Sequence, residues 1–187
     1  MPESQPPLQA GEQPVEQAVS ADDFKAAFRN HPAGVAVITA DAGRGPVGLT
    51  ATSVTSVSAN PPLLIFSLSA HSSSGPALNA AATVVVHLLG ESHLELAKTF
   101  ATSGIDRFAD ASTWSRLPTG EPFLPSASTW MRGKIVNRMD VGDSLIIAAE
   151  ILEVHLPDES TRLPENSRPL VYHNRTWHAL SDSSTID

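Results

Sequence analysis

The feature that most constrains the fold is the stretch STWMRGKIVNRMDVGDSLIIAAEILEVHL, which runs from Ser128 to Leu156. It holds two long runs rich in Ile, Val and Leu, separated near residues 140–143, and two such runs around a Gly-containing turn predict a β-hairpin. Further strands are expected at residues 35–40, 63–68 and 82–90, and a last hairpin is expected to turn at Asn174-Arg175. There is no regular βαβ alternation and no G-x-G-x-x-G motif after a strand. We therefore expect a mainly β fold, an antiparallel barrel with a few short peripheral helices.

Composition and charge limit what the chain can do. It has 187 residues with 41% hydrophobic content, enough for one domain with a substantial core. The net charge of -8 disfavours nucleic acid and acidic membranes as partners, so an anionic ligand has to be held by local donors. No cysteine is present, which excludes thiol catalysis and cysteine-ligated metals. The histidines are not spaced as a metal motif, so no metal is expected.

The two ends of the chain differ from its middle. Residues 1–20 are rich in Pro, Gln and Glu and are expected to form a disordered tail, because they cannot bury enough apolar surface to offset the entropy of ordering. One domain is expected over residues 21–180, followed by a polar C-terminal tail at 181–187. The sequence shows neither a secretory signal nor an apolar run of membrane-spanning length, so a cytoplasmic protein is expected.

The first candidate site lies in GLTATSVTSVSANPPLLIFSLS, from Gly48 to Ser69, whose first half reads as a polar strand and whose second half reads as an apolar one. Hydroxyl groups fall on both faces of the first half, at Thr50, Thr52, Ser53, Thr55, Ser56 and Ser58. One interpretation is a solvent-facing edge strand, since Thr has a good β propensity. The other is a strand that offers its backbone and hydroxyls to a flat polar ligand.

Two further signals point to an anion. Ser72, Ser73 and Ser74 precede a short helix, where hydroxyls and free N–H groups bind phosphate, although Ser73 or Ser74 could equally be an ordinary N-cap. Arg107, in the sequence DRF, could bind a phosphate through its forked guanidinium. Its plainer role would be a surface salt bridge with Asp106 or Asp110.

Taken in order, these segments resemble the flavin reductase family. The resemblance is carried by GVAVITA, the Gly48–Ser69 block, SSSGPAL, VVVHLLGESHLELAKTFA, DRF, GDS and PLVYHNRTWHAL, and it covers the region from about Ala21 to Leu180. It implies a split β-barrel that binds FMN or FAD and uses NADH or NADPH as co-substrate. It also implies a homodimer that supplies reduced flavin to a partner monooxygenase.

The resemblance also implies roles for particular residues. The flavin ring or ribityl chain would contact Thr50, Ala51, Thr52, Ser53 and Val54, with Ser56 and Ser58 extending that contact. The flavin phosphate would be held by Ser72, Ser73, Ser74 and Arg107. No catalytic side chain is implied, because hydride passes directly between the two cofactors.

One departure from the family pattern affects the nicotinamide site. The family commonly carries Gly-Asp-His at the start of the late strand, whereas this chain has Gly142, Asp143 and Ser144. Serine keeps a hydrogen bond but lacks the stacking face and the titration of imidazole. The alternative to a reductase is therefore a flavin-binding split-barrel protein with little NAD(P)H reductase activity. A third hypothesis is a barrel that binds an apolar ligand other than flavin.

Overall fold

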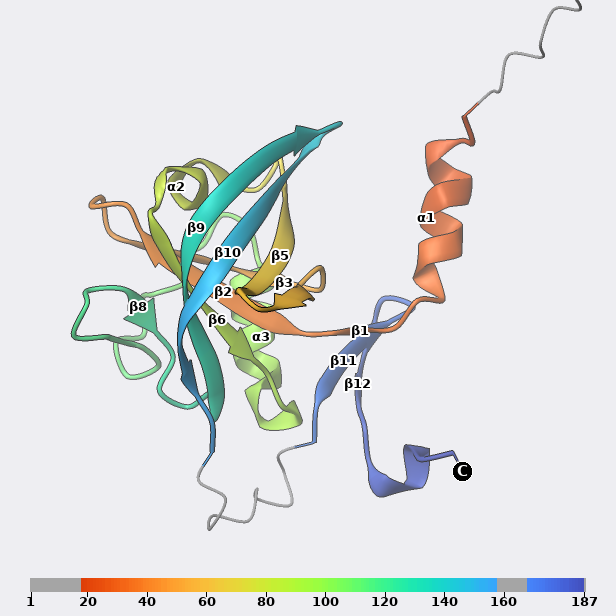
Figure 1. Cartoon of the computed structure of the whole chain (residues 1–187). Coiled ribbons are helices and arrows are strands. Elements are labelled where there is room, and N and C mark those ends of the chain that lie inside the picture. Colours follow the sequence, from red (N-terminus) through yellow and green to blue (C-terminus); the bar gives the residue numbers. More distant parts are fainter. Residues whose placement is uncertain (1–17, 158–167, 187) are drawn as a thin grey trace, which may run out of the picture.

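The computed structural model describes residues 18–157 and 168–186, and its centre is a seven-stranded antiparallel sheet curved into a barrel (Figure 1). The strand order is β3-β2-β6-β9-β10-β5-β4. The bounds are β2 Ala36–Asp41, β3 Pro46–Ala51, β4 Thr55–Ala59, β5 Pro62–Ser69, β6 Thr83–Leu88, β9 Thr129–Val141 and β10 Ser144–His155. This arrangement confirms the mainly β, antiparallel barrel that the sequence predicts.

The long hairpin expected from Ser128 to Leu156 is β9 and β10. Only Gly142 and Asp143 separate the two strands, and Val141 pairs with Ser144. Gly142 has a φ of 59°, a value that glycine adopts without strain and that the first position of a two-residue hairpin turn requires. Gly142 and Asp143 thus serve as a hairpin turn, whatever else they contact.

The hydroxyl-rich segment, expected as one strand, is two strands at opposite ends of the sheet. β3 ends at Ala51 and β4 begins at Thr55, and the chain crosses between the two edges at residues 52–54. The Ser53 hydroxyl holds this crossing to β5, since it accepts a hydrogen bond from the N–H of Ser67 (3.0 Å). β4 is a largely exposed edge strand, which agrees with the plainer interpretation for that half of the segment.

Both faces of β2 are buried, which explains why its sequence is almost wholly apolar. Ala36, Ile38 and Ala40 point into the barrel, while Val37 packs outside it against α3 (Leu94–Ala101). Phe100 is the largest α3 side chain in this outer cluster and is 1% exposed. Helix α3, preceded by the 3-10 helix η1 (Glu91–His93), therefore covers the outside of the barrel next to β2 and β3.

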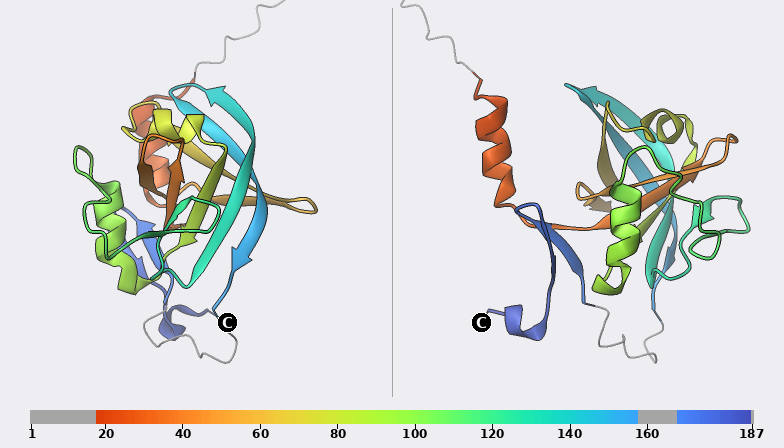
Figure 2. Two further views of the ribbon diagram at one scale, coloured as in Figure 1. Left: turned by 90° about the vertical axis from the view of Figure 1, so that its left-hand side faces the viewer. Right: turned by 180° about the vertical axis from the view of Figure 1, so that it is seen from behind.

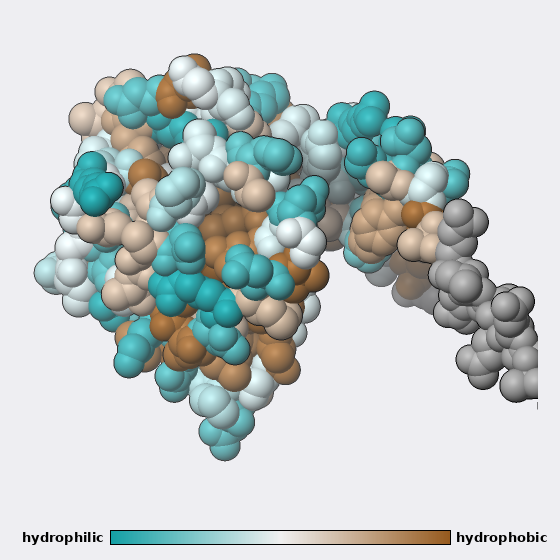
Figure 3. Space-filling view, turned by 90° about the horizontal axis from the view of Figure 1, so that it is seen from above, coloured by the Kyte–Doolittle hydropathy of each residue, from teal (hydrophilic) through white to brown (hydrophobic). Residues whose placement is uncertain are grey.

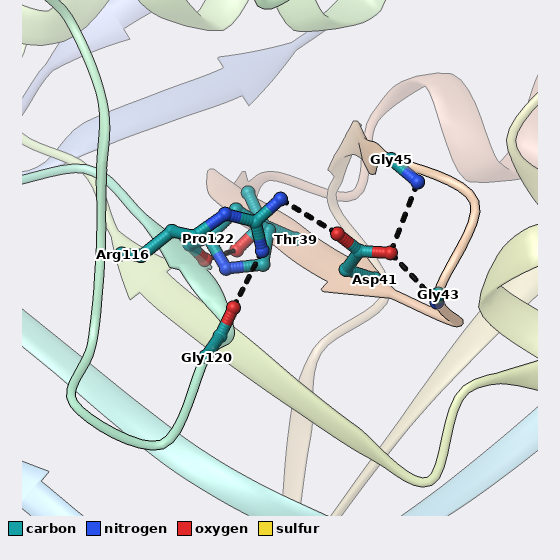
Figure 4. Close-up of polar contacts among 7 residues, drawn as sticks. All are labelled: Thr39, Asp41, Gly43, Gly45, Arg116, Gly120 and Pro122. Carbon is teal, nitrogen blue, oxygen red and sulfur yellow. Dashed lines mark hydrogen bonds and ion pairs between the residues drawn. The ribbon is translucent and has the colours of Figure 1, made fainter.

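A second covering element is the irregular segment after α3, which contains β7 (Ser115–Arg116) and β8 (Pro122–Phe123). Figure 4 shows how it is fixed to the turn that joins β2 and β3. Asp41 accepts hydrogen bonds from the backbone N–H groups of Gly43 (2.8 Å) and Gly45 (3.1 Å). Its other oxygen pairs with Arg116 at 2.7 Å, and Arg116 also donates to the carbonyl of Gly120 at 2.6 Å. We call Asp41, Arg116 and these partners the loop clamp.

Two buried side chains on the barrel hold the same segment. Thr39 donates to the carbonyl of Pro122 at 2.5 Å, and the His87 ring nitrogens bridge the Val37 carbonyl (3.0 Å) and the Leu124 N–H (3.0 Å). His87 must therefore be a neutral imidazole that donates from Nδ1 and accepts at Nε2. Burial lowers the pKa of His87 to about 4, opposed in part by the bond to Val37 and aided by the charge of His93.

An arm extends from the barrel on one side (Figures 1 and 2). It comprises helix α1 (Ala21–Arg29) and a small sheet of β1 (Ala33–Gly34), β11 (Leu170–His173) and β12 (Thr176–Ala179), followed by the 3-10 helix η2 (Asp182–Ser184). The predicted turn at Asn174-Arg175 is confirmed, with both residues at positive φ. Of the tail predicted at residues 1–20, residues 1–17 lie outside the described residues. In the described chain no helix is long and apolar enough to cross a membrane.

Candidate functional site

The residues singled out from the sequence meet at a cleft of about 470 Å³ on the barrel wall. The cleft lies between β3, β5, the loop after β5, the end of α3 and the start of the irregular segment. Its lining comprises Leu49, Thr50, Ala51, Thr52, Ser53, Ser67, Leu68, Ser69, His71, Ser72, Ser73, Phe100, Ala101, Ser103, Arg107 and Ser144. Eight of these were singled out from the sequence: Thr50, Ala51, Thr52, Ser53, Ser72, Ser73, Arg107 and Ser144.

Arg107 is the only cation of the lining, and neutral groups hold it. Its Nε donates to the carbonyl of Thr102 (3.0 Å), and its Nη1 donates to the carbonyl of Gly48 (3.0 Å) and to the Ser74 hydroxyl (2.5 Å). The expected salt bridge is wrong: Asp106 instead accepts from the N–H of Phe108, and within the described residues no carboxylate pairs with Arg107. Its positive charge therefore remains available to an anion in the cleft.

Partial burial lowers the pKa of the Arg107 guanidinium below its ordinary value. An arginine stays protonated at neutral pH even so. A positive charge that has lost part of its water shell without gaining a negative partner has an increased attraction for an anion. Ser72 and Ser73, which follow β5 on the facing side of the cleft, add hydroxyl groups beside it.

Ser74 lies behind this end of the cleft and does not line it. It is 4% exposed, and its hydroxyl donates to the carbonyl of Gly48 (2.9 Å) while accepting from Arg107. It makes no side-chain cap bond to α2 (Gly75–Ala80), so the expected N-cap role is wrong as well. The Ser74 hydroxyl cannot cap α2 because it already bonds to the carbonyl of Gly48 in β3 and to Arg107.

Gly48 is required at this place by close packing. A Cβ added to it would lie 2.6 Å from Cε1 of Phe100 and 3.0 Å from the carbonyl oxygen of Ile38. No real Cβ contact is that short, so the ring of Phe100 packs directly on the backbone of β3. This contact brings α3, and with it Arg107, against the strand that forms the cleft wall.

The opposite end of the cleft is built at the crossing between the two sheet edges. Thr52, Ser53 and Ser67 lie there together with Ser144, the first residue of β10. Thr50 also lines the cleft, but its hydroxyl is used by a 2.6 Å bond to the carbonyl of Ala97 in α3. Hydroxyl groups line this end of the cleft, and the largely buried side chains of Leu49, Leu68 and Phe100 lie beneath them.

Besides Ser74, five residues of the expected set lie outside this lining. Val54 packs against the barrel core, while Ser56 and Ser58 belong to the edge strand β4. Gly142 and Asp143 line a neighbouring hollow of about 340 Å³ between β5, α2 and the β9–β10 turn, and Ser144 is shared by both spaces. Among the described residues, no group of three or more His, Asp or Glu side chains is placed to hold a metal.

The sequence reasoning missed several lining residues, above all Phe100, Ser67 and Ser103. Phe100 carried only the signal of a core helix residue, although it also lines the cleft and packs on Gly48 of β3. Ser67 stands in an apolar strand, where a single hydroxyl was the available signal. Gly48, which supports the cleft from behind its lining, carried no sequence signal, because the contact that requires glycine comes from a helix distant in sequence.

Comparison with known proteins agrees with the fold. Residues 28–181 match the model of the flavin reductase like domain. The chain is 45% identical over 160 residues, covering 86% of it and 82% of the relative, to an NADH:FMN oxidoreductase of Rhodococcus qingshengii. The chain is also similar to the reductase component of a 4-nitrophenol 4-monooxygenase/4-nitrocatechol 2-monooxygenase of Rhodococcus opacus. The two are 33% identical over 146 residues, which cover 76% of this chain and 78% of the relative.

A solved structure of similar shape is that of a flavin reductase domain protein from Arthrobacter sp. FB24. It superposes with a TM-score of 0.79 at 34% sequence identity, over 89% of this chain and 97% of that one. The family model spans most of the chain, and the relatives match over most of their own length. The chain therefore belongs to the flavin reductase family.

Proposed function

We propose that this flavin reductase holds its flavin in the cleft described above, with the phosphate at Arg107 and the ring toward Thr52, Ser53 and Ser144. The observation that carries this assignment is the charge of Arg107, which has neutral partners only, at one end of a cleft lined by hydroxyl groups. The protein is an NAD(P)H:flavin oxidoreductase. We propose NADH and FMN as the preferred pair, as the name of the Rhodococcus relative suggests.

The residues of the cleft fit a flavin. A volume of about 470 Å³ lies within the range of pockets that enclose small ligands. The hydroxyls of Thr52 and Ser53 are available for polar contacts with the edge of a flavin ring. Arg107, Ser72 and Ser73 form the charge-assisted contacts that a phosphate requires.

A flavin held by Arg107, Thr52 and Ser53 would supply the redox chemistry, as the acceptor of a hydride from a reduced nicotinamide and of a proton from solvent. The protein needs no nucleophile or general base for this. Its residues orient the two rings and exclude water from one face of the cleft. Ser144, at the boundary of two hollows, is placed to contact the nicotinamide in the position where the family commonly has histidine.

The proposal includes a homodimer. β3 and β4 end the sheet as edge strands, which are a liability unless they are covered. Large apolar side chains are also exposed on the β9–β10 hairpin, with Val136 47%, Met139 53% and Val141 45% exposed. Such a surface is typical of an interface between protein molecules. A second copy of the chain is the proposed occupant, and light scattering on the purified protein tests it.

The enzyme supplies reduced flavin to a separate monooxygenase, as reductase components of this family do. A cleft that opens to solvent supports this role, because reduced flavin has to leave it. We place the protein in the cytoplasm, the compartment in which reduced nicotinamide is available to such an enzyme.

The test is anaerobic oxidation of NADH and of NADPH, followed by absorbance, with FMN, FAD and riboflavin in turn. Turnover of flavin in excess over enzyme, fastest with NADH and FMN, is the expected result. No turnover, with FMN still raising the melting temperature, would instead favour a protein that only holds flavin. If no flavin changed the stability of the protein, this cleft would not be the flavin site.

A further inference from the structure

The position of Arg107 depends on the spacing between helix α3 and strand β3. Its guanidinium donates to a backbone carbonyl of each: Nε bonds to Thr102, the C-cap residue of α3 (3.0 Å), and Nη1 bonds to Gly48 in β3 (3.0 Å). The next residue is tied to the same helix, because the ring of Phe108 packs edge-on against Phe100 with the centroids 5.2 Å apart. A movement of α3 away from β3 would therefore separate the groups that hold the guanidinium.

Two contacts set this spacing. Gly48 and Thr50 are two positions apart on β3, so both face α3, whereas Leu49 between them belongs to the barrel core. At Gly48 the ring of Phe100 packs directly on the strand, because no Cβ is present. At Thr50 the side-chain hydroxyl donates to the carbonyl of Ala97 in α3 at 2.6 Å. Ala97 and Phe100 are three positions apart on the helix, so both contacts act on one helix face.

The hydroxyl of Thr50 has no other evident purpose in the fold. Within the described residues it makes the only side-chain hydrogen bond between α3 and β3. Helix α1 forms a lobe apart from the barrel (Figure 3), so it does not press α3 onto the strand. Packing in the strand does not require a hydroxyl either, because valine has nearly the same shape and a high β propensity. The hydroxyl is therefore explained by its bond to α3.

We propose that Thr50 is a positioning residue for the flavin phosphate: its bond to Ala97 fixes α3 against β3 and so keeps Arg107 at the phosphate end of the cleft. This rests on the proposed function, which places the phosphate at Arg107. The resemblance to the family implies a different role for Thr50, a direct contact with the flavin ring or ribityl chain. A direct contact acts on the part that FMN and riboflavin share, whereas a positioning role acts on the phosphate, which riboflavin lacks.

The test compares the dissociation constants of FMN and riboflavin, measured by flavin fluorescence on the full chain. Thr50→Val removes the hydroxyl at nearly unchanged volume, and it should weaken FMN about fivefold relative to riboflavin, the effect of one hydrogen bond. Thr50→Ser keeps the hydroxyl and should restore most of that difference. Thr99→Val is the matched control, since the Thr99 hydroxyl also donates to an α3 carbonyl, that of Glu95 (3.0 Å), in an exposed bond within the helix. This control should leave the ratio of the two constants unchanged.

A second variant changes the same spacing without removing a hydroxyl or a residue of the cleft lining. In Gly48→Ala the added Cβ would lie 2.6 Å from the ring of Phe100, so α3 has to move outward. The affinity for FMN relative to riboflavin should fall at least as far as in Thr50→Val. Thermal unfolding of each variant shows that it is folded, and Thr50→Val decides alone if Gly48→Ala does not fold.

Two outcomes would overturn the proposal. Equal losses for FMN and riboflavin in Thr50→Val would make Thr50 a direct contact of the flavin. An unchanged affinity for both would show that the packing of Phe100 on Gly48 suffices to hold α3. Failure of the proposed function would look different, because the unchanged protein would then bind FMN no more tightly than riboflavin.

Discussion

Arg107 and Arg116 belong to the same irregular segment between α3 and β9, yet their surroundings are opposite in kind. Arg116 pairs with the carboxylate of Asp41, whose second oxygen is occupied by two backbone N–H groups, so every charge in the loop clamp is balanced. Burial raises the pKa of Asp41, but these hydrogen bonds outweigh it and hold the pKa below its usual value. Arg107 has only carbonyls and a hydroxyl as partners.

The difference shows what distinguishes a structural arginine from a binding one. In the loop clamp the carboxylate neutralises the guanidinium, so an added anion would gain no binding energy there. In the cleft, the neutral acceptors fix the position of the guanidinium without neutralising it. Fixing a charge while leaving it uncompensated is the condition for binding an anion with little reorganisation. Four measurements test this comparison.

The largest effect is expected from pH. It should change the stability of the protein through the segment that the loop clamp holds. The pKa of His87 is lowered from 6.5 to about 4, so the unfolded chain binds the proton first as the pH falls. Stability is therefore fully present above pH 6.5 and falls by ~3 kcal/mol as the pH approaches the folded pKa. Denaturant unfolding between pH 7.5 and 5.5 measures the first part of this fall, above the ordinary pKa values of Asp41 and Glu121. A flat profile, or the same slope in His87→Gln, would contradict the assignment.

The second effect separates the two arginines directly. Arg107→Ala should weaken FMN about thirtyfold but riboflavin only slightly, because riboflavin has no phosphate and one charge-assisted contact with a phosphate is lost. Its matched control, Arg116→Ala, should leave the ratio of the two affinities unchanged and reduce stability by about 1–2 kcal/mol, since Asp41 loses its partner. If Arg107→Ala weakened the binding of FMN and riboflavin equally, the phosphate would not lie at this end of the cleft.

A smaller effect is expected from Ser74, which does not touch the cleft. Ser74→Ala removes the hydroxyl that positions Arg107 against Gly48, so the affinity for FMN relative to riboflavin should fall about fivefold. A purely structural role would change the melting temperature and both flavin affinities together. An unchanged ratio would show that the carbonyls of Gly48 and Thr102 suffice to hold the guanidinium.

The smallest effect is expected from Ser144→His, which restores the residue common in the family at the boundary of the two hollows. An imidazole there adds a stacking face for the nicotinamide, so KM for NADH should fall a few-fold at constant FMN affinity. KM for NADH and turnover are measured in parallel with the unchanged protein. If neither changes, position 144 does not contact the nicotinamide in this chain.

The sequence predicted the elements well and their junctions poorly. The hairpins at β9–β10 and β11–β12 were foreseeable, because the apolar runs and the turn residues are local signals. The division of the Gly48–Ser58 segment into β3 and β4 was not, since residues 52–54 contain neither Gly nor Pro and the break is set by bonds to β5. Local hydrogen-bonding patterns do not encode which sheet edge a strand joins.

The residue types of the candidate site could be predicted, but the roles of the individual residues could not. Thr52, Ser53, Ser72, Ser73 and Arg107 were found because their hydroxyls and charge exceed what a core or a surface needs. Ser74 was assigned either to the phosphate or to a helix cap, and the structure gives it to Arg107. That outcome depends on a contact between residues 33 positions apart, which no local pattern reports.

The position of β3 and β4 at opposite ends of the sheet has a kinetic consequence. The proposed flavin cleft needs residues from β3, β5, α3 and β10, so it exists only once both edges of the sheet are in place. Contacts this distant in sequence form late in folding. A ligand that recognises only the completed edges binds after the folding transition state. Flavin should therefore slow unfolding and leave the rate of folding unchanged.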